Sequence, residues 1–364
     1  MWYFTIVTCS IGLLMAAVYM LICIGRFDFV KKLANGKRWL NIIISFMIFV
    51  FMFTAFSIIF SPLNAIMISM NVLFIFMLSA LLMKIVKCLS SHKFKPNLQG
   101  YIAVIFSVVY LSIGYYLDNN VWRTDYSLTT TKNLGELKIA LIADSHIGTT
   151  FDGKGFAEHI KNIEKQDADV LFIAGDFVDD LTKKKDMLTA CKALGNTHFK
   201  YGVWYIFGNH DEGFFNKRNF TAADLENALK ENGVHIMLDR YELVDDRFYV
   251  VGRNDSSFKE RKDIVNVMHG IDSEKYIIIL DHEPNDYTNE AATAADLVLS
   301  GHTHGGQLFP IMYLCDWFNI NDRTYGYEKR KGTDFIVTSG ISDGQIVFKT
   351  GTKSEYVIID IKQV

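Results

Sequence analysis

Acidic side chains are almost missing from the first third of this 364-residue chain. Residues 1–117 contain nine basic residues and one acidic residue, Asp28, whereas residues 118–364 contain the remaining 28 basic and 39 acidic residues. The net charge of −3 is therefore the sum of about +8 and about −11 from two unlike regions. The apolar first region excludes an entirely soluble protein, and the acidic second region argues against broad binding to nucleic-acid backbones.

Cysteine is also scarce. The five cysteines form no CxxC pair, and two of them, Cys9 and Cys23, lie in an apolar run near the start. This distribution argues against a disulfide-stapled scaffold and against a cysteine-based zinc site. Cysteine therefore provides no candidate site.

Charged side chains are absent from two long stretches, 2–25 and 39–83. A helix needs about 20 apolar residues to span the hydrocarbon core, so the first stretch suits one span and the second suits two, divided at the turn-forming cluster Ser61-Pro62-Leu63-Asn64. A further apolar run ends in Tyr115-Tyr116, aromatic residues suited to the membrane interface. Over residues 1–117 we expect four retained transmembrane helices, at about 2–25, 39–60, 63–83 and 98–117. A cleaved signal peptide is disfavoured because its basic start is missing.

The loops between these expected helices differ in charge. Five basic residues separate the first helix from the second and four separate the third from the fourth, whereas no charge separates the second from the third. Short basic loops remain in the cytoplasm, which predicts a multi-pass cell-membrane protein with an extracytoplasmic C-terminal domain. The helices themselves contain no Asp, Glu, Lys, Arg or His. Because transport pathways usually contain such groups, we favour a membrane anchor over a channel or transporter with a regulatory domain.

After a polar stretch at 118–136, interpreted as a linker, short apolar runs alternate with amphipathic segments. Stretches at 154–166, 182–195 and 221–231 predict helices. The alternation indicates a layered α/β domain over 137–364, with helices outside a central sheet. The predicted strands lie at 137–143, 170–174, 203–207, 248–251, 276–280, 297–299, 335–337 and 356–361.

Polar side chains with metal-binding chemistry follow five of these strands. Ligands of open α/β sheets bind beyond the carboxyl ends of the strands, so we expect these side chains to gather at one edge. Imidazole and carboxylate without thiolate suit Zn, Mn, Fe, Co or Ni, and the donors exceed the need of one tetrahedral ion. Two ions would use them all, an arrangement suited to in-line phosphoryl displacement. The residues are Asp144, His146, Asp176, Asn209, His210, Asp211, His282, His302 and His304.

The blocks Asp-x-His, Gly-Asp, Gly-Asn-His-Asp, a lone His and Gly-His-x-His, in that order across 144–304, resemble the calcineurin-like metallophosphoesterase superfamily. The run Gly301–Gln307 and the segment Val337–Gly340 look like its membrane-associated bacterial phosphodiesterase branch, which is related to the UDP-2,3-diacylglucosamine hydrolases. The resemblance covers only the second region of the chain. It implies a four-layer α/β/β/α sandwich and two divalent metal ions, drawn from Mn, Zn, Fe, Ni and Co.

The resemblance also implies residue roles. One ion would be held by Asp144, His146 and His304, with Asp176 bridging to the other ion, and the second would be completed by Asn209, His282 and His302. A hydroxide between the ions would attack phosphorus. His210, oriented by Asp211, would protonate the leaving oxygen.

Each of these residues also has an ordinary structural interpretation. Asp144 and Asp176, taken singly, could cap the helices that follow them, and His282 could be a surface turn residue. Asp179 could either orient ligands or be a solvated loop carboxylate. The ordered set favours the metal site over these separate explanations.

We therefore expect a membrane-anchored enzyme that hydrolyses phosphodiester or pyrophosphate bonds, on an envelope lipid or a nucleotide-linked substrate. Its expected partners are the phosphoester substrate and the bilayer, with no specific nucleic acid and no protein partner. Two alternatives stay open: a phosphomonoesterase acting on phosphoproteins, and a metal-binding sensor that keeps the fold without turnover. The loop Glu212-Gly213-Phe214 departs from many relatives, so substrate specificity does not carry over from the family.

Overall fold

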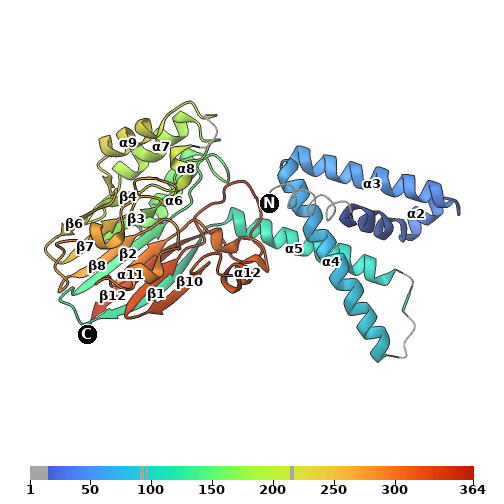
Figure 1. Ribbon diagram of the computed structural model, residues 1–364. Coiled ribbons are helices and arrows are strands. Elements are labelled where there is room, and N and C mark those ends of the chain that lie inside the picture. Colours follow the sequence, from blue (N-terminus) through green and yellow to red (C-terminus); the bar gives the residue numbers. More distant parts are fainter. Residues whose placement is uncertain (1–14, 91–93, 96, 214–216) are drawn as a thin grey trace. The chain divides into compact units, whose positions relative to one another are not determined.

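The computed structural model describes residues 15–90, 94–95, 97–213 and 217–364. The chain divides into two compact units. A helical unit comprises Met1–Ile113 with Gln345–Val347, and an α/β unit comprises Gly114–Gly344 with Phe348–Val364. Figure 1 shows the helices of the first unit and the strands and helices of the second.

Among the described residues, three helices are long and apolar enough to cross a membrane: α3 (Arg38–Ile59), α4 (Pro62–Leu89) and α5 (Leu98–Asn119), the last of which belongs to the helical unit as far as Ile113. α2 (Asp28–Leu33) is a short helix before α3. Of the expected span at 2–25, residues 1–14 lie outside the described residues, and Met15–Gly25 is an apolar helix. The interruption at Ser61 is present, because the Ser61 side chain accepts a hydrogen bond from Asn64 N and Pro62 occupies the first turn of α4.

Two of these helices extend beyond the ranges expected from the sequence. α4 continues to Leu89 rather than 83, and α5 continues to Asn119 rather than 117. The prediction used charged residues as boundaries, and Lys84, Lys87 and Asp118 are helical all the same. A helix can leave the hydrocarbon core without ending, because a long lysine side chain reaches the interface.

The α/β unit is built on two six-stranded sheets, shown by the arrows in Figure 1. In the first sheet the order is β1-β12-β2-β3-β4-β5, and every neighbouring pair is parallel except β12 with β2. Its strands are β1 (Trp122–Thr130), β2 (Glu136–Ile142), β3 (Val170–Ala174), β4 (Val203–Ile206), β5 (His235–Ile236) and β12 (Glu355–Gln363).

The second sheet has the order β10-β11-β9-β8-β7-β6, with its central strands β11, β9, β8 and β7 parallel and an antiparallel strand at each edge. Its strands are β6 (Arg240–Val244), β7 (Phe248–Gly252), β8 (Tyr276–Leu280), β9 (Leu297–Ser300), β10 (Gly326–Arg330) and β11 (Thr333–Val337).

Three apolar layers hold these sheets together. Between the sheets, alternate side chains such as Leu141 and Phe172 pack against Ile278 and Leu299 of the opposite sheet. The outer face of the first sheet is covered by α6 (Gly153–Glu164), α7 (Lys184–Gly195) and α9 (Ala222–Glu231). The outer face of the second packs against α10 (Ile264–Val267) and α11 (Tyr287–Glu290). The expected four-layer α/β/β/α sandwich after an apolar helical region is thus confirmed.

One expectation about this unit needs correction. The stretch 118–136, interpreted as a linker, contains β1, which pairs in parallel with β12 along its whole length from Trp122 to Thr130. β1 lies at the edge of the sheet, and most of its side chains are exposed or half-buried. Because one side is solvated, the strand alternates polar and apolar residues and lacks the continuous apolar run that identified the buried strands.

Candidate metal centre

Five strand ends bring the predicted residues into one place. Asp144 and His146 follow β2, Asp176 follows β3, and Asn209 begins the short helix α8 (Asn209–Glu212) after β4. From the other sheet, His282 follows β8, and the pair His302 and His304 follows β9. Because the carboxyl ends of these parallel strands from both sheets point to the same edge, the side chains converge there.

The backbone at these strand ends is strained. Asp144, His146, Asp176, His302 and His304 all have positive φ angles, between 35° and 70°. Non-glycine residues adopt this region at an energetic cost, and such residues cluster at functional sites. The surrounding structure therefore fixes the direction of each of these side chains before any ligand binds.

A first group of donors consists of Asp144, His146 and His304, whose ligand atoms all lie within 4.8 Å of one another. A carboxylate lies beside the outward-facing nitrogen of two of these imidazoles. His146 Nδ1 lies 3.2 Å from Asp179 Oδ2, and His304 Nδ1 lies 2.8 Å from Asp343 Oδ1. These contacts direct the Nε2 atom of each ring into the group, the arrangement typical of metal-binding histidines.

A second group consists of Asp176, His282 and His302. His282 Nδ1 donates to the carbonyl oxygen of Ala174 at 2.7 Å, which leaves its Nε2 atom facing the group. The amide oxygen of Asn209 lies 3.0 Å from His302 Nδ1 and 3.3 Å from His282 Nε2. Asn209 therefore lies at the second group, where the sequence predicts it.

Asp176 stands between the two groups. Its Oδ2 atom lies 3.6 Å from His146 Nε2 and 3.2 Å from His282 Nε2, and its Oδ1 atom accepts a hydrogen bond from the backbone N–H of His210 at 2.8 Å. Gly208 keeps this carboxylate accessible, because a Cβ atom there would collide with Asp176 Oδ1. The position suits a carboxylate shared by two ions.

The donors fit divalent metal ions. They are imidazole nitrogens and carboxylate or amide oxygens without a thiolate, which suits borderline transition metals. His146 Nε2 is buried and has no hydrogen-bond partner among the residues that the structure describes. A buried nitrogen without a partner costs free energy unless something binds it, and a metal ion would satisfy it.

The electrostatics of the two groups also favour cations. Burial works against a charged His146, but Asp179, Asp176 and Asp144 outweigh it and raise the pKa of His146 to about 9. Burial lowers the pKa of His304 to about 4 despite the nearby Asp144. Despite its burial, His282 and His146 hold the pKa of Asp176 well below its usual range. The carboxylate is therefore ionised, and neutral His304 has a free nitrogen to offer a metal.

His210 lies beside the two groups. Its side chain is 28% exposed, and its Nδ1 atom lies 3.7 Å from Asp179 Oδ2. Burial lowers the pKa of His210, partly opposed by Asp176. The ring is thus more accessible than the buried imidazoles around it, as a group that exchanges a proton with a substrate must be.

Asp211 does not take the position expected from the sequence. Its two carboxylate oxygens accept hydrogen bonds from the backbone N–H groups of Val178 at 3.0 Å and Gly208 at 2.8 Å. Adjacent residues of a helix point in different directions, so Asp211 faces the interior while His210 faces the site. Burial and the charge of Asp176 raise the pKa of Asp211 to about 6. Asp211 therefore connects the loop after β3 with the loop after β4. The carboxylate near His210 is that of Asp179.

Sequence reasoning left Asp179 undecided and missed Asp343. Asp179 is buried and contacts His146 directly, so it is not a solvated loop carboxylate. Asp343 follows β11, which is parallel to β9. The rule that ligands gather beyond the carboxyl ends of parallel strands would therefore have identified Asp343 as well.

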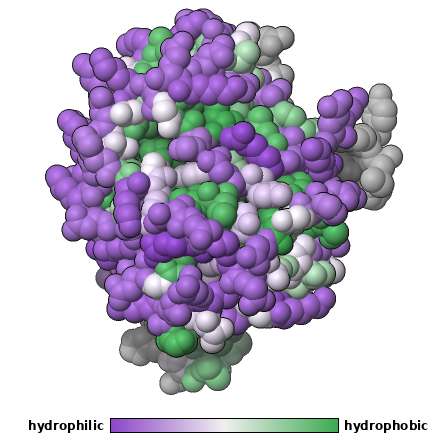
Figure 2. Space-filling model, turned by 90° about the vertical axis from the view of Figure 1, so that its left-hand side faces the viewer, coloured by the Kyte–Doolittle hydropathy of each residue, from purple (hydrophilic) through white to green (hydrophobic). Residues whose placement is uncertain are grey.

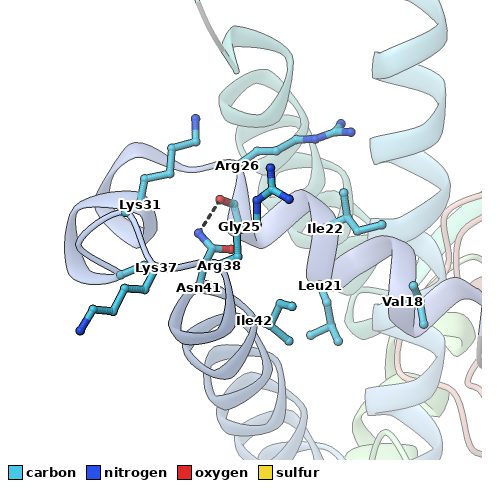
Figure 3. Close-up of a pocket in the computed structure, with 12 residues that line it drawn as sticks. Val18, Leu21, Ile22, Gly25, Arg26, Lys31, Lys37, Arg38, Asn41 and Ile42 are labelled. Atoms are coloured by element: carbon cyan, nitrogen blue, oxygen red, sulfur yellow. Dashed lines mark hydrogen bonds between the residues drawn. The ribbon is translucent and has the colours of Figure 1, made fainter.

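A cavity of about 660 Å³ lies elsewhere, within the helical unit. Figure 3 shows Val18, Leu21, Ile22 and Ile42 at one end of it and the basic residues Lys31 and Lys37 at the other. The Asn41 side chain donates to the carbonyl oxygen of Gly25 at 3.0 Å. The residues that line this cavity include neither histidine nor carboxylate, so it is not a second metal site.

Known proteins resemble this chain over the α/β unit. The family profile described as calcineurin-like phosphoesterase matches residues 137–306. The uncharacterized metallophosphoesterase Cj0846 of Campylobacter jejuni is 28% identical over 268 residues, which cover 71% of this chain and 68% of that protein. An uncharacterized metallophosphoesterase of Aquifex aeolicus is 27% identical over 71% of this chain and 98% of its own length. The transmembrane protein with metallophosphoesterase domain of Danio rerio is 28% identical over 64% of this chain, which spans about half (54%) of that relative.

The fold, the two donor groups and these relatives define a metal-dependent phosphoesterase. More particularly, residues 137–306 match the profile of the calcineurin-like phosphoesterase family, and the similar proteins are named metallophosphoesterases. The three membrane-capable helices, together with a relative named as a transmembrane protein, indicate membrane association.

Proposed function

We propose that this chain is a membrane-anchored phosphoesterase that uses two divalent ions to hydrolyse phosphodiester or pyrophosphate bonds. The observation that carries the proposal is the convergence of donors from five strand ends into two groups, with Asp176 in one group and only 3.6 Å from His146 Nε2 of the other. One ion alone would leave donors unused, whereas two ions engage both groups.

Seven residues would hold these ions. Asp144, His146 and His304 belong to one group, Asn209, His282 and His302 to the other, and Asp176 to both. When bound, the ions supply Lewis acidity toward the phosphoryl oxygens and toward the attacking water. Asp179, Asp343 and the Ala174 carbonyl fix the rings of the ligand histidines, so the ligands keep their directions during turnover.

His210 would donate the proton that the leaving oxygen needs. It is the more exposed imidazole beside the shared carboxylate, and its backbone N–H is fixed by Asp176. Asp179, 3.7 Å from His210 Nδ1, would stabilise the protonated ring. A positioned acid of this kind accelerates the departure of a poor leaving group by typically 10²–10⁴-fold.

The substrate and the side of the membrane are part of the same proposal. The basic loops favour an extracytoplasmic α/β unit, where envelope lipids and nucleotide-linked sugars or lipids present phosphodiester and pyrophosphate bonds. Kinship with the UDP-2,3-diacylglucosamine hydrolases, supported by the run Gly301–Gln307, points to the same substrate class. A reporter fused to the C-terminus that is active only outside the cytoplasm tests the sidedness, and activity only of a cytoplasmic reporter contradicts it.

The activity is tested with the full chain in lipid nanodiscs. Metal-depleted protein is supplied with Mn, Zn, Ni, Co or Fe and given bis(4-nitrophenyl) phosphate or 4-nitrophenyl phosphate. We expect metal-dependent hydrolysis that prefers the diester. Hydrolysis of the monoester alone would favour the phosphomonoesterase, and two bound ions without turnover of either would favour the sensor.

A further inference from the structure

An exposed apolar patch surrounds α12 (Ile311–Trp317) in the α/β unit. α12 has no buried residue among its seven, and Trp317 and Phe318 are 78% and 70% exposed. Asp316 is the sole charged residue between Gln307 and Asn321. We call this surface the α12 patch, and its largest members are Phe309, Tyr313, Leu314, Trp317, Phe318 and Ile320.

This surface differs from what an aqueous domain normally shows. The face of the α/β unit in Figure 2 is mainly hydrophilic, with hydrophobic residues interspersed among polar ones. In the α12 patch, by contrast, consecutive residues of one short segment expose aromatic and aliphatic side chains together. Contiguous exposed apolar surface of this kind marks a site that binds protein or membrane.

The α12 patch lies beside the end of α5. Residues of α5 from Gly114 onward belong to the α/β unit, and the Gly114 carbonyl accepts a hydrogen bond from Lys349 N at 3.0 Å. The next residue, Thr350, accepts a hydrogen bond from Phe309 N through its Oγ1 atom at 3.1 Å. A path of two hydrogen bonds and the link between two consecutive residues therefore connects Gly114 of α5 to Phe309 at the start of the patch. This path corresponds to a separation on the order of 10 Å.

The end of α5 locates the boundary of the bilayer. No charged residue lies between Lys95 and Asp118, so the apolar part of α5 extends to Leu117. Tyr115 and Tyr116, 44% and 55% exposed, stand in its last turns, and exposed tyrosines concentrate at the headgroup level. Surface within about 10 Å of this level falls within reach of the interfacial layer, in which amphipathic helices lie at depths of about 5–10 Å.

We propose that the α12 patch inserts into the interface of the same bilayer that α5 crosses. The partner is lipid rather than protein because the side chains are those of an interfacial segment, with Trp, Tyr and Phe dominant, and because the patch adjoins a membrane-capable helix. The insertion holds the α/β unit with this side against the membrane.

The same contacts connect the patch to the metal centre. Thr352 Oγ1 donates to the carbonyl oxygen of His304 at 3.3 Å, and Gly306 lies so close to Met312 of α12 that a Cβ atom there would be 2.5 Å from its Cα. Docking α12 on lipid therefore places the loop with His302 and His304 near the headgroups. If the loop binds metal as proposed above, a lipid phosphoester becomes a substrate within its reach. This consequence rests on the proposed function, whereas the insertion itself does not.

Fluorine NMR tests the insertion directly. The full chain, labelled with 5-fluorotryptophan, is placed in nanodiscs of phosphatidylcholine and phosphatidylglycerol that carry a gadolinium-chelate headgroup lipid. Trp317→Phe assigns the resonance of Trp317. We expect that resonance to broaden severalfold when the gadolinium lipid is added, while that of Trp204, which is 2% exposed within the core, stays sharp.

A matched exposed position provides the control. Leu188 is 46% exposed on α7, which covers the outer face of the first sheet, and the additional resonance of Leu188→Trp should stay as sharp as that of Trp204. A Trp317 resonance no broader than that of the Leu188→Trp residue overturns the proposal, and if it shifts with protein concentration instead, a second copy covers the patch. Hydrolysis of bis(4-nitrophenyl) phosphate by the same samples reports the proposed function separately, because that soluble substrate needs no membrane contact.

Discussion

The helical unit and the α/β unit use apolar side chains in opposite ways. In α3, Ser45 is the buried residue, whereas Phe51 and Ile58 are 74% and 80% exposed. In the α/β unit the strands β3 and β8 are fully buried apolar runs, and charged groups enter the interior where they meet one another, as Arg253 meets Asp281. The difference shows that each unit is adapted to its own solvent, lipid for one and water for the other. The clustered histidines and carboxylates of the candidate metal centre lie in the α/β unit.

The most severe test of this division is Asp176→Asn. Loss of the carboxylate that we propose both ions share should lower kcat toward bis(4-nitrophenyl) phosphate by about 10³-fold or more, since roughly 4 kcal/mol of transition-state stabilisation is at stake. The matched control in the helical unit is Asn41→Ala, which removes the hydrogen bond to Gly25. If turnover fell as much in the Asn41 variant as in the Asp176 variant, catalysis would depend on both units, contrary to this division.

The next largest effect is expected from His210→Ala, and it should depend on the leaving group. With an alkyl leaving group kcat should fall by about 10²–10⁴-fold, because the departing oxygen needs a proton. With 4-nitrophenolate, a good leaving group, the loss should be small. Equal losses with both substrates would mean that His210 binds substrate or shapes the site instead of donating a proton.

The same residue gives a pH dependence. Burial lowers the pKa of His210 from its ordinary value of 6.5, with Asp176 partly opposing this shift. The protonated form needed by an acid is therefore present at low pH and is lost as pH rises through a value below 6.5. The kcat for the alkyl diester should decline on this alkaline side, and His210→Ala should remove that limb from the pH profile. If kcat still declines at alkaline pH in the variant, the decline reports the titration of a group other than His210.

A smaller effect is expected from the carboxylates that hold the ligand histidines. Asp343→Asn should weaken metal binding by about 10–100-fold, because it removes the negative charge 2.8 Å from the Nδ1 atom of His304. Competition with a fluorescent chelator measures the affinity. Asp334→Asn is the control, since that aspartate is also buried but pairs with Lys329, away from the donors. An unchanged affinity in the Asp343 variant would remove this residue from the metal centre.

The smallest effect is expected at helix α9, which belongs to the water-soluble α/β unit. Thr221 caps α9, and Asp224 accepts in return from Thr221 N at 2.8 Å. Thr221→Ala should cost about 1 kcal/mol, so amide hydrogens in the first turn of α9 should exchange about fivefold faster. Lys183→Ala is the control, because Lys183 precedes α7 without a side-chain cap. Equal exchange in both variants would contradict the capping role.

The stabilisation that this cap gives to α9 should also be lost at low pH. Hydrogen bonds from the Thr221 backbone and hydroxyl, with a contribution from Lys184, lower the pKa of Asp224 to about 2 from 3.8. A carboxylate with a depressed pKa stabilises the fold above its unfolded value and loses that effect as pH falls through the folded one. Protection of the α9 amides should therefore decrease between about pH 4 and pH 2.

The sequence predicts the interior of the α/β unit better than its edges. The eight strands with neighbours on both sides are all marked by apolar runs, whereas the four that were not recognised, β1, β5, β6 and β10, are the edge strands of the two sheets. An edge strand faces solvent on one side and is shorter or more polar, so it leaves a weaker pattern.

The convergence of the candidate donors at one edge of the sheets was predictable for a similar reason. Its donors follow buried strands directly, so Asp144, Asp176 and His302 were placed without knowledge of side-chain contacts. The role of Asp211 was not predictable, because the direction of its side chain depends on the turn of α8 and on the N–H groups of Val178 and Gly208. Partners chosen by tertiary packing cannot be derived from residue order alone.

The proposed mechanism requires that the α/β unit holds two ions that act together. The most direct measurement counts Mn bound per full-length chain in nanodiscs at equilibrium while following hydrolysis of bis(4-nitrophenyl) phosphate in the same samples. We expect two ions per chain, turnover that appears only as the second ion binds, and loss of that coupling in Asp176→Asn. Full turnover with a single ion, or turnover that persists after all metal is removed, would contradict it.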